Sequence, residues 1–157
     1  LHDRFKEEGA DLMLSVINQW DAFKDAAVEQ AGESTYAHKF KTENLPALRK
    51  IEFAKPADEI HNQIRGLSPW PGAVFEHNGN EIKVLESTLS KKAELNGISL
   101  EKTAKICEIV KIDNETLWVQ AKNDIVGLKM LQRSGKRAMP VREFLKGYPL
   151  QVGEVLY

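Results

Sequence analysis

The spacing of hydrophobic positions divides the chain into a helical first part and a strand-rich second part. Over residues 1–30 apolar side chains recur every three or four positions, which is typical of an amphipathic helix. Gly9 weakens the middle of this segment by about 1 kcal/mol relative to alanine, so two shorter helices are an open alternative. The apolar positions are Phe5, Leu12, Met13, Val16, Ile17, Trp20 and Phe23.

One helix of this kind cannot bury its apolar face alone, so we expect residues 1–30 to be the tail of a larger domain. The periodicity then fades over residues 31–54, where glycine, proline and hydroxyl side chains favour a linker. A second helix is predicted over residues 55–66. Its apolar face comprises Ala57, Ile60, Ile64 and Leu67.

Two prolines that bracket a tryptophan follow this helix, in the stretch Ser68-Pro69-Trp70-Pro71-Gly72. Each proline fixes its own φ and disfavours a helical conformation at the residue before it. The stretch therefore predicts a stiff corner that ends the helix. We expect Trp70 to anchor this corner by packing into the core.

Beyond the corner, apolar and polar positions alternate as in strands. Asn78-Gly79 is a strong signal for a β-hairpin turn. A polar connection is expected over residues 91–102, and a short helix over residues 140–146. Several short strands with one helical insert suggest a small OB-like barrel, so the predicted fold class is α+β. The expected strands are 73–76, 82–89, 104–112, 117–121, 125–131 and 152–156.

Composition mainly argues against membrane-spanning and secreted proteins. With 42% hydrophobic and 29% charged residues the chain is an ordinary globular protein, and no apolar run approaches the roughly 18 residues of a membrane span. The first residues do not follow the basic-then-apolar pattern of a signal peptide, so none is expected. The single cysteine, Cys107, cannot form an internal disulfide, which favours a reducing compartment and a cytoplasmic location. We expect Cys107 to be a core residue inside the strand over 104–112.

Charge is distributed unevenly along the chain. Residues 1–35 carry eight acidic side chains against three basic ones, and residues 129–146 carry six basic side chains against Glu143 alone. An acidic start and a basic end cancel in the formal net charge of −1. Such asymmetry indicates an electrostatic partner for the basic end.

The basic end is also the one stretch with candidate chemistry. No nucleophilic set, phosphate-cradling glycine loop or metal-ligand spacing occurs, so neither a catalytic residue nor a metal site is expected. In Leu131–Met139 a strand ends in a glycine turn whose bases can contact phosphates through charge-assisted bonds. A turn that only keeps the protein soluble, and a linker that is only solvated, are the alternatives. The candidates are Lys136 and Arg137, then Arg133, Lys129, Arg142 and Lys146, with Lys39 and Lys41 in the linker.

Several of these stretches resemble the methionyl-tRNA formyltransferase family. The corner Ile64–Ala73 and the turn Leu131-Gln132…Gly135-Lys136-Arg137…Met139 carry most of the resemblance. The order of the motifs along the chain is also that of the family. Further similar stretches are Leu1-His2-Asp3…Leu12-Met13, Thr35-Tyr36-Ala37…Lys39, Ile51-Glu52-Phe53 and Phe144-Leu145-Lys146-Gly147…Val152-Gly153.

The resemblance implies a function and a domain arrangement. Members transfer a formyl group from 10-formyltetrahydrofolate to the amino group of methionyl initiator tRNA, in translation initiation. Residues 1–30 would then be the last helix of a truncated catalytic domain, residues 31–54 a linker, and residues 55–157 the C-terminal domain. That domain is expected to hold the tRNA acceptor arm through the bases named above, with neither DNA nor a membrane as partner. The folate and the catalytic set belong to the missing domain, so the fragment is expected to be inactive alone.

Two other interpretations stay open. The corner is shared with sugar and folate formyltransferases, in which the barrel would be a spacer that binds no nucleic acid. A free-standing binding module of OB type is the third possibility. Lys55, where many members have a serine or threonine helix cap, and residues 91–103 depart from the family pattern.

Overall fold

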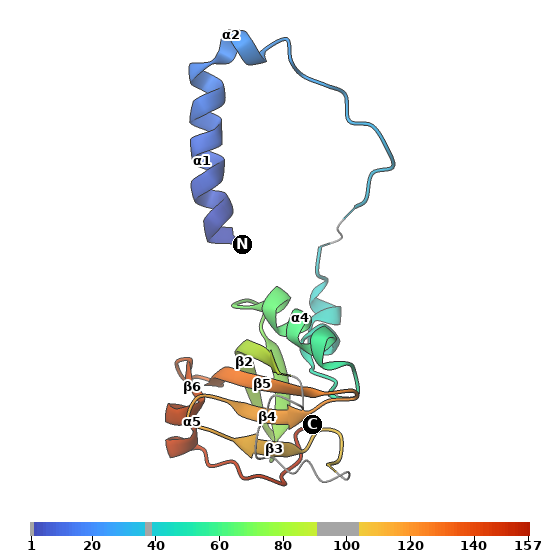
Figure 1. The fold of residues 1–157 in the computed structure, drawn as a ribbon, viewed down its shortest axis with the longest axis vertical. Helices are drawn as coiled ribbons and strands as arrows, with labels where there is room; N and C mark the ends of the chain where they lie inside the picture. The colour runs from blue at the N-terminus through green and yellow to red at the C-terminus, as the bar shows by residue number, and fades with distance from the viewer. Residues whose placement is uncertain (1, 37–38, 91–103) are drawn as a thin grey trace. The chain divides into compact units, whose positions relative to one another are not determined.

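The structure is a computed structural model that describes residues 2–36, 39–90 and 104–157 (Figure 1). The chain divides into two compact units, Leu1–Lys39 and Phe40–Tyr157, each of which is described by itself. Helices and an antiparallel sheet occur in the same chain, which confirms the expected α+β class. Among the described residues, no helix combines the length and hydropathy that a membrane crossing requires.

The first unit contains the predicted amphipathic helix. Helix α1 spans His2–Asn18 and α2 spans Trp20–Phe23. The break falls at Gln19 rather than at Gly9, because a single glycine inside a long helix is tolerated despite its cost. The helical conformation ends earlier than residue 30. Large apolar side chains of both helices are exposed, with Leu12 66% and Trp20 60% accessible.

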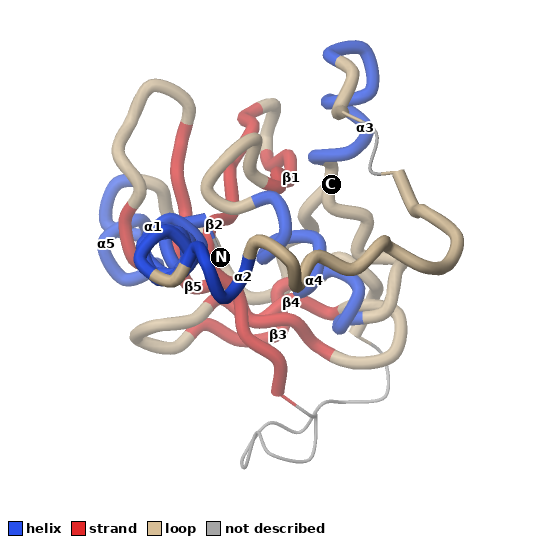
Figure 2. The backbone as a smooth tube through the Cα atoms, turned by 90° about the horizontal axis from the view of Figure 1, so that it is seen from above, coloured by secondary structure: helices blue, strands red, loops and turns tan. Residues whose placement is uncertain are grey.

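The second unit begins with a short 3₁₀ turn, η1 (Thr42–Asn44), and the helix α3 (Leu45–Arg49). Ile51 and Phe53 follow and are almost completely buried, so the core of this unit begins before the helix that we predicted from residue 55. The Ile51 amide donates to the Val74 carbonyl, which holds α3 beside strand β1 (Ala73–His77) (Figure 2).

Helix α4 (Ala57–Leu67) confirms the second predicted helix, and all four residues of its apolar face are buried. It packs against strands β2 (Asn80–Ser90) and β5 (Ile125–Arg133). Pro56 at the N-cap has no side-chain acceptor for the helix, and the Ala57 amide instead donates to Asn123 Oδ1 at 2.9 Å. A residue far away in sequence therefore replaces the local cap.

The corner after α4 forms as predicted, but the expectation that Trp70 packs into the core is wrong. Trp70 is 70% exposed, whereas Leu67 and Ala73 on either side of the corner are buried. The peptide bonds before Pro69 and Pro71 are both cis. Because the chain between two buried positions reverses here, the residue at its tip faces solvent.

Six strands form one antiparallel sheet in the order β1-β2-β5-β4-β3, with β6 paired to β5 (Figure 1). Asn78 and Gly79 have positive φ values of 49° and 72°, so the hairpin between β1 and β2 is the predicted one. Helix α5 (Val141–Gly147) confirms the short helix near the end of the chain. The strands are β1 (Ala73–His77), β2 (Asn80–Ser90), β3 (Ile109–Ile112), β4 (Leu117–Gln120), β5 (Ile125–Arg133) and β6 (Met139–Pro140).

The last residues of the chain join the two ends of this sheet. The Ile109 amide of β3 donates to the Glu154 carbonyl, and the Tyr157 amide donates to the Glu76 carbonyl of β1. Leu156 is fully buried between these contacts. The segment predicted as a strand over 152–156 thus forms one isolated bridge, Glu108 with Val155, and separate hydrogen bonds to β3 and β1 rather than a regular ladder.

Cys107 lies outside any strand, contrary to the sequence expectation. Its φ is +74°, which a strand cannot accommodate, so β3 begins only at Ile109. Cys107 is half-buried against the core, and this burial raises the pKa of its thiol. The polar connection predicted over 91–102 lies outside the described residues.

Candidate nucleic-acid interface

The basic turn between β5 and β6 is held by its own backbone and by one glutamine. The Lys136 amide donates to the Arg133 carbonyl at 3.1 Å, and Gln132 Nε2 donates to the Lys136 carbonyl at 2.7 Å. Gly135 has a φ of +69°, a conformation that favours glycine. These contacts fix the path of the turn and give Gln132 and Gly135 a structural role in it.

Lys136 and Arg137 project from this turn into solvent. Both are exposed, and neither has an ion pair with any carboxylate in the part of the chain that the structure describes. Cationic groups without a carboxylate partner are available to bind an anion from another molecule. A fixed turn with free charges is suited to contacting phosphates, whereas a paired charge must first be released.

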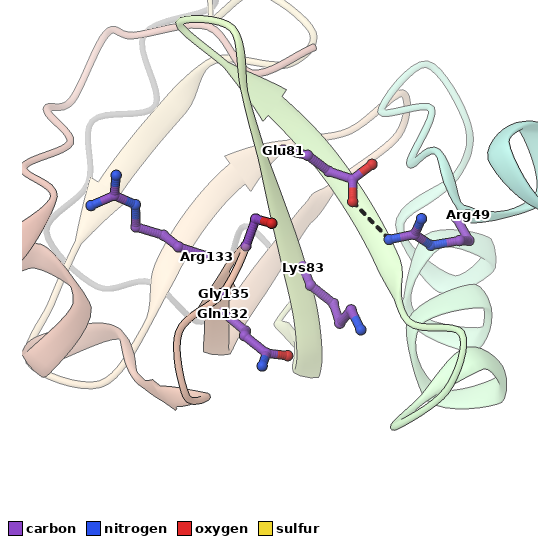
Figure 3. Close-up of a pocket in the computed structure, with 7 residues that line it drawn as sticks. Arg49, Glu81, Lys83, Gln132, Arg133 and Gly135 are labelled. Atoms are coloured by element: carbon purple, nitrogen blue, oxygen red, sulfur yellow. Dashed lines mark hydrogen bonds and ion pairs between the residues drawn. The ribbon is translucent and has the colours of Figure 1, made fainter.

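Arg133 has a different environment from its neighbours. Its guanidinium carbon lies 4.9 Å from the ring centroid of Tyr148, the residue after α5, in a cation–π contact. In turn the Tyr148 hydroxyl donates to the His77 carbonyl at 3.0 Å. In Figure 3 the side chains of Arg133 and Lys83 point in opposite directions. Arg133 is therefore half-buried and helps to hold α5 beside β1.

Lys129 and Arg142 lie together, but in a mixed electrostatic setting. Both line a cavity of about 480 Å³ that also contains Glu86, Glu115 and Glu143. Lys146 lies one helical turn after Arg142 on α5, and both are exposed. The six bases near the chain end thus fall into two groups, one at the turn and one along β5 and α5.

The two linker lysines lie outside both groups. Lys39 is the last residue of the first unit and is exposed. Lys41 is the second residue of the second unit, and its ammonium lies 3.7 Å from Glu43 Oε1. The structure therefore gives Lys39 no position relative to the turn.

Two basic residues that the sequence analysis did not single out lie beside the turn. Arg49 of α3 and Lys83 of β2 line a cavity of about 210 Å³ with Gln132, Ser134 and Gly135 (Figure 3). Lys83 is opposite Gln132 in the pairing of β2 with β5. That pairing joins segments almost fifty residues apart, so the sequence contains no local signal for it.

Two histidines of the second unit lie within hydrogen-bond distance of other side chains. His61 Nδ1 and Ser87 Oγ are 2.8 Å apart, and His77 Nδ1 lies 2.9 Å from the Tyr148 hydroxyl. No group of three potential metal ligands occurs among the residues that the structure describes. The basic turn and its neighbouring cavity are thus the best-defined candidate site.

Comparison with known proteins assigns the second unit to a family. Residues 46–149 match the family described as formyl transferase, C-terminal domain. Curated relatives named methionyl-tRNA formyltransferase include those of Sinorhizobium medicae, 36% identical over 96% of this chain, and Syntrophomonas wolfei, 33% identical over 94%. The chain spans 44% of the length of each of these relatives.

Solved structures agree in fold. HypX from Aquifex aeolicus is 14% identical, with a TM-score of 0.57 over 88% of this chain and 23% of its own. A second HypX structure, in complex with tetrahydrofolic acid, gives a TM-score of 0.54 at 15% identity over 90% of this chain and 26% of its own. At this identity the likeness concerns the fold alone. From the extent of the family match, this chain belongs to the formyl transferase C-terminal domain family.

Proposed function

We propose that this chain is the tRNA-binding C-terminal part of a methionyl-tRNA formyltransferase. The name of its curated relatives supports the substrate, and the family match supports the place of the domain in such an enzyme. The whole enzyme would transfer the formyl group of 10-formyltetrahydrofolate to the methionine on initiator tRNA, in the cytoplasm. The part described here would hold the acceptor arm.

The observation that carries this proposal is the fixed turn with its unpaired cations. Gln132 orients the turn backbone, and Lys136 and Arg137 remain exposed without a carboxylate partner among the described residues. Contacts from such side chains to phosphates supply affinity and position but read no base sequence. RNA helices are recognised largely through shape and backbone, which suits a module of this kind.

The domain arrangement belongs to the same proposal. The amphipathic face of α1 and α2 is exposed in its own unit, which suits a helix that packs on a catalytic domain. Residues 1–30 would form the end of that domain, residues 31–54 a linker, and residues 55–157 the C-terminal domain. The folate and the catalytic groups would be bound by the part that is not in this chain.

A salt titration tests the tRNA interface. We expect the affinity of the chain for initiator tRNA to fall steeply with salt, because phosphate contacts release counterions. The double variant Lys136→Ala/Arg137→Ala should lower the affinity roughly tenfold and reduce the slope of log affinity against log salt by about 1–2. Filter binding at several salt concentrations measures both quantities.

The matched control is Lys105→Ala/Lys122→Ala, which removes two exposed lysines outside the turn. It should leave both affinity and slope close to those of the parent chain. An affinity independent of salt, or equal losses in the two double variants, would contradict the proposal and favour a spacer that binds no RNA.

The second test concerns catalysis. The chain alone should show no formyl transfer from 10-formyltetrahydrofolate to methionyl initiator tRNA, because the proposal assigns the reacting groups to another domain. A discontinuous assay that separates formylmethionyl-tRNA from methionyl-tRNA measures this. Turnover by the purified chain would show that the domain assignment is wrong.

A further inference from the structure

Lys83 has an unusual position beside the proline–tryptophan corner. Gly72 has a φ of +81°, and a Cβ at this residue would lie 2.7 Å from Lys83 Cγ and 2.8 Å from Lys83 Cε. The aliphatic stem of Lys83 therefore lies directly across the glycine backbone, in space that any side chain at position 72 would fill. The absence of a side chain at Gly72 leaves the room that the lysine stem occupies.

The ammonium group at the end of this stem has no partner among the described residues. No hydrogen bond or ion pair joins the Lys83 ammonium to any residue that the structure describes, although the Lys83 backbone pairs within the sheet. The adjacent carboxylate, Glu81, is bound by Arg49 Nη2 at 2.8 Å, and Arg49 Nε donates to the Gly72 carbonyl at 3.1 Å. Arg49 and Glu81 neutralise each other, which leaves Lys83 as an uncompensated positive charge in the cavity.

This charge is next to the basic turn. The cavity of about 210 Å³ is lined by Lys83 and Arg49 and also by Ser134 and Gly135 of the turn. Figure 3 shows Lys83 and Arg49 on the opposite side of the site from Gly135. Gln132 connects the two features, because it is opposite Lys83 in the strand pairing and donates to the Lys136 carbonyl. Arg133 also lines the cavity, but its guanidinium lies over the Tyr148 ring. The charge offered beside Gln132 is therefore that of Lys83, which is complementary to one phosphodiester group.

We infer that Lys83, oriented by Gly72, forms a phosphate subsite for the RNA backbone adjacent to the turn of residues 134–137. The inference rests on the proposed function, since it takes the same RNA as ligand. The Lys83 ammonium donates to a phosphate oxygen, and the Arg49–Glu81 pair forms the wall of the cavity. The proline–tryptophan corner then contributes to binding by placing Gly72 under the lysine.

The experiment uses Lys83→Met in the 157-residue chain. Methionine keeps an unbranched apolar stem over Gly72 and removes the charge, so folding is preserved and only the contact is lost. We expect a three- to tenfold loss of affinity for initiator tRNA and a salt slope smaller by about 0.7–0.9, the value for one phosphate contact. Lys83→Arg should retain most of the affinity and most of the salt slope. Lys122→Met, in the turn between β4 and β5, should leave the affinity and the slope unchanged.

The comparison with Lys136→Ala/Arg137→Ala separates the two proposals. If that variant loses affinity and Lys83→Met does not, the subsite is wrong and the proposed function stands. If neither variant loses affinity, the proposed function fails with it.

Inorganic phosphate, titrated at constant ionic strength and followed by amide chemical shifts, distinguishes free phosphate from RNA. We expect shifts at Lys83 and Gly135 that disappear in Lys83→Met. Phosphate shifts that depend on Lys83, combined with unchanged tRNA affinity, would assign the cavity to a free anion and overturn the RNA subsite.

Discussion

At the scale of single residues, hydrogen bonding rather than residue type decides the role of each polar group. Asp113, in the turn between β3 and β4, accepts Trp118 Nε1 at 2.8 Å and the amides of Glu115 and Thr116 at 3.1 and 2.9 Å. Burial alone would raise the pKa of Asp113, but these bonds and the charge of Lys111 outweigh it and lower the pKa. The carboxylate therefore stabilises the turn only while it is ionised.

This predicts a pH-dependent contribution to stability. Because the pKa of folded Asp113 lies below the ordinary value of 3.8, its stabilisation is present above pH 3.8 and is lost as pH falls through the lower folded value. Asp113→Asn should lower the free energy of unfolding by about 1 kcal/mol at neutral pH, through weaker hydrogen bonds.

The difference in the free energy of unfolding between the parent chain and Asp113→Asn should shrink as pH falls below 3.8. Urea unfolding at several pH values would measure it. Asp58→Asn on the exposed face of α4 is the control. A gap for Asp113→Asn that stays constant down to the acid limit would mean that another group carries the effect.

At the scale of elements, the corner between α4 and β1 shows that the path of the backbone does not determine which side chains are buried. The prolines and Gly72 set the backbone path, and the Gly72 amide closes the reversal with a 2.9 Å bond to the Leu67 carbonyl. Leu67 is 5% exposed and Trp70 is 70% exposed. Leu67, which begins this corner, therefore contributes to the core, whereas the larger side chain of Trp70 does not.

Trp70→Ala should consequently leave stability almost unchanged. We expect a loss within about 0.5 kcal/mol, as for other surface substitutions, and a loss of about 2–4 kcal/mol for Leu67→Ala. Urea denaturation followed by circular dichroism measures both. A loss near 3–5 kcal/mol for Trp70→Ala would show that the ring is buried after all.

At the scale of the whole second unit, the C-terminal residues complete the sheet. Residues 153–157 hydrogen-bond to β3 on one side and to β1 on the other, and the buried side chain of Leu156 lies between the two. The strands at both ends of the sheet order are thereby protected from pairing with other chains. The candidate interface lies at the other end of β5 from the turn that caps α4.

Leu156→Ala tests this role. Truncation of a fully buried leucine should cost about 2–4 kcal/mol, whereas Val152→Ala, which removes a 60% exposed side chain four residues earlier, should cost less than about 0.5 kcal/mol. Chemical denaturation of the two variants provides the comparison. Equal losses would indicate that the end of the chain is held without Leu156.

Local sequence alone determined the elements whose signals are complete within a few residues. The apolar face of α4, the Asn78-Gly79 hairpin and the short helix α5 all formed as predicted, because helical periodicity and turn conformation act over short distances. The Gln132–Lys136 turn also lies in one continuous stretch, which is why its bases could be named in advance.

Only the tertiary structure decided what depends on segments far apart in the chain. It placed Trp70 outside and Arg133 against Tyr148, supplied the Asn123 cap of α4, and brought Lys83 beside the basic turn. The physical reason is that burial and charge compensation depend on which strands pair. Nothing within β2 specifies that Lys83 will face Gln132 until β5 has docked beside it.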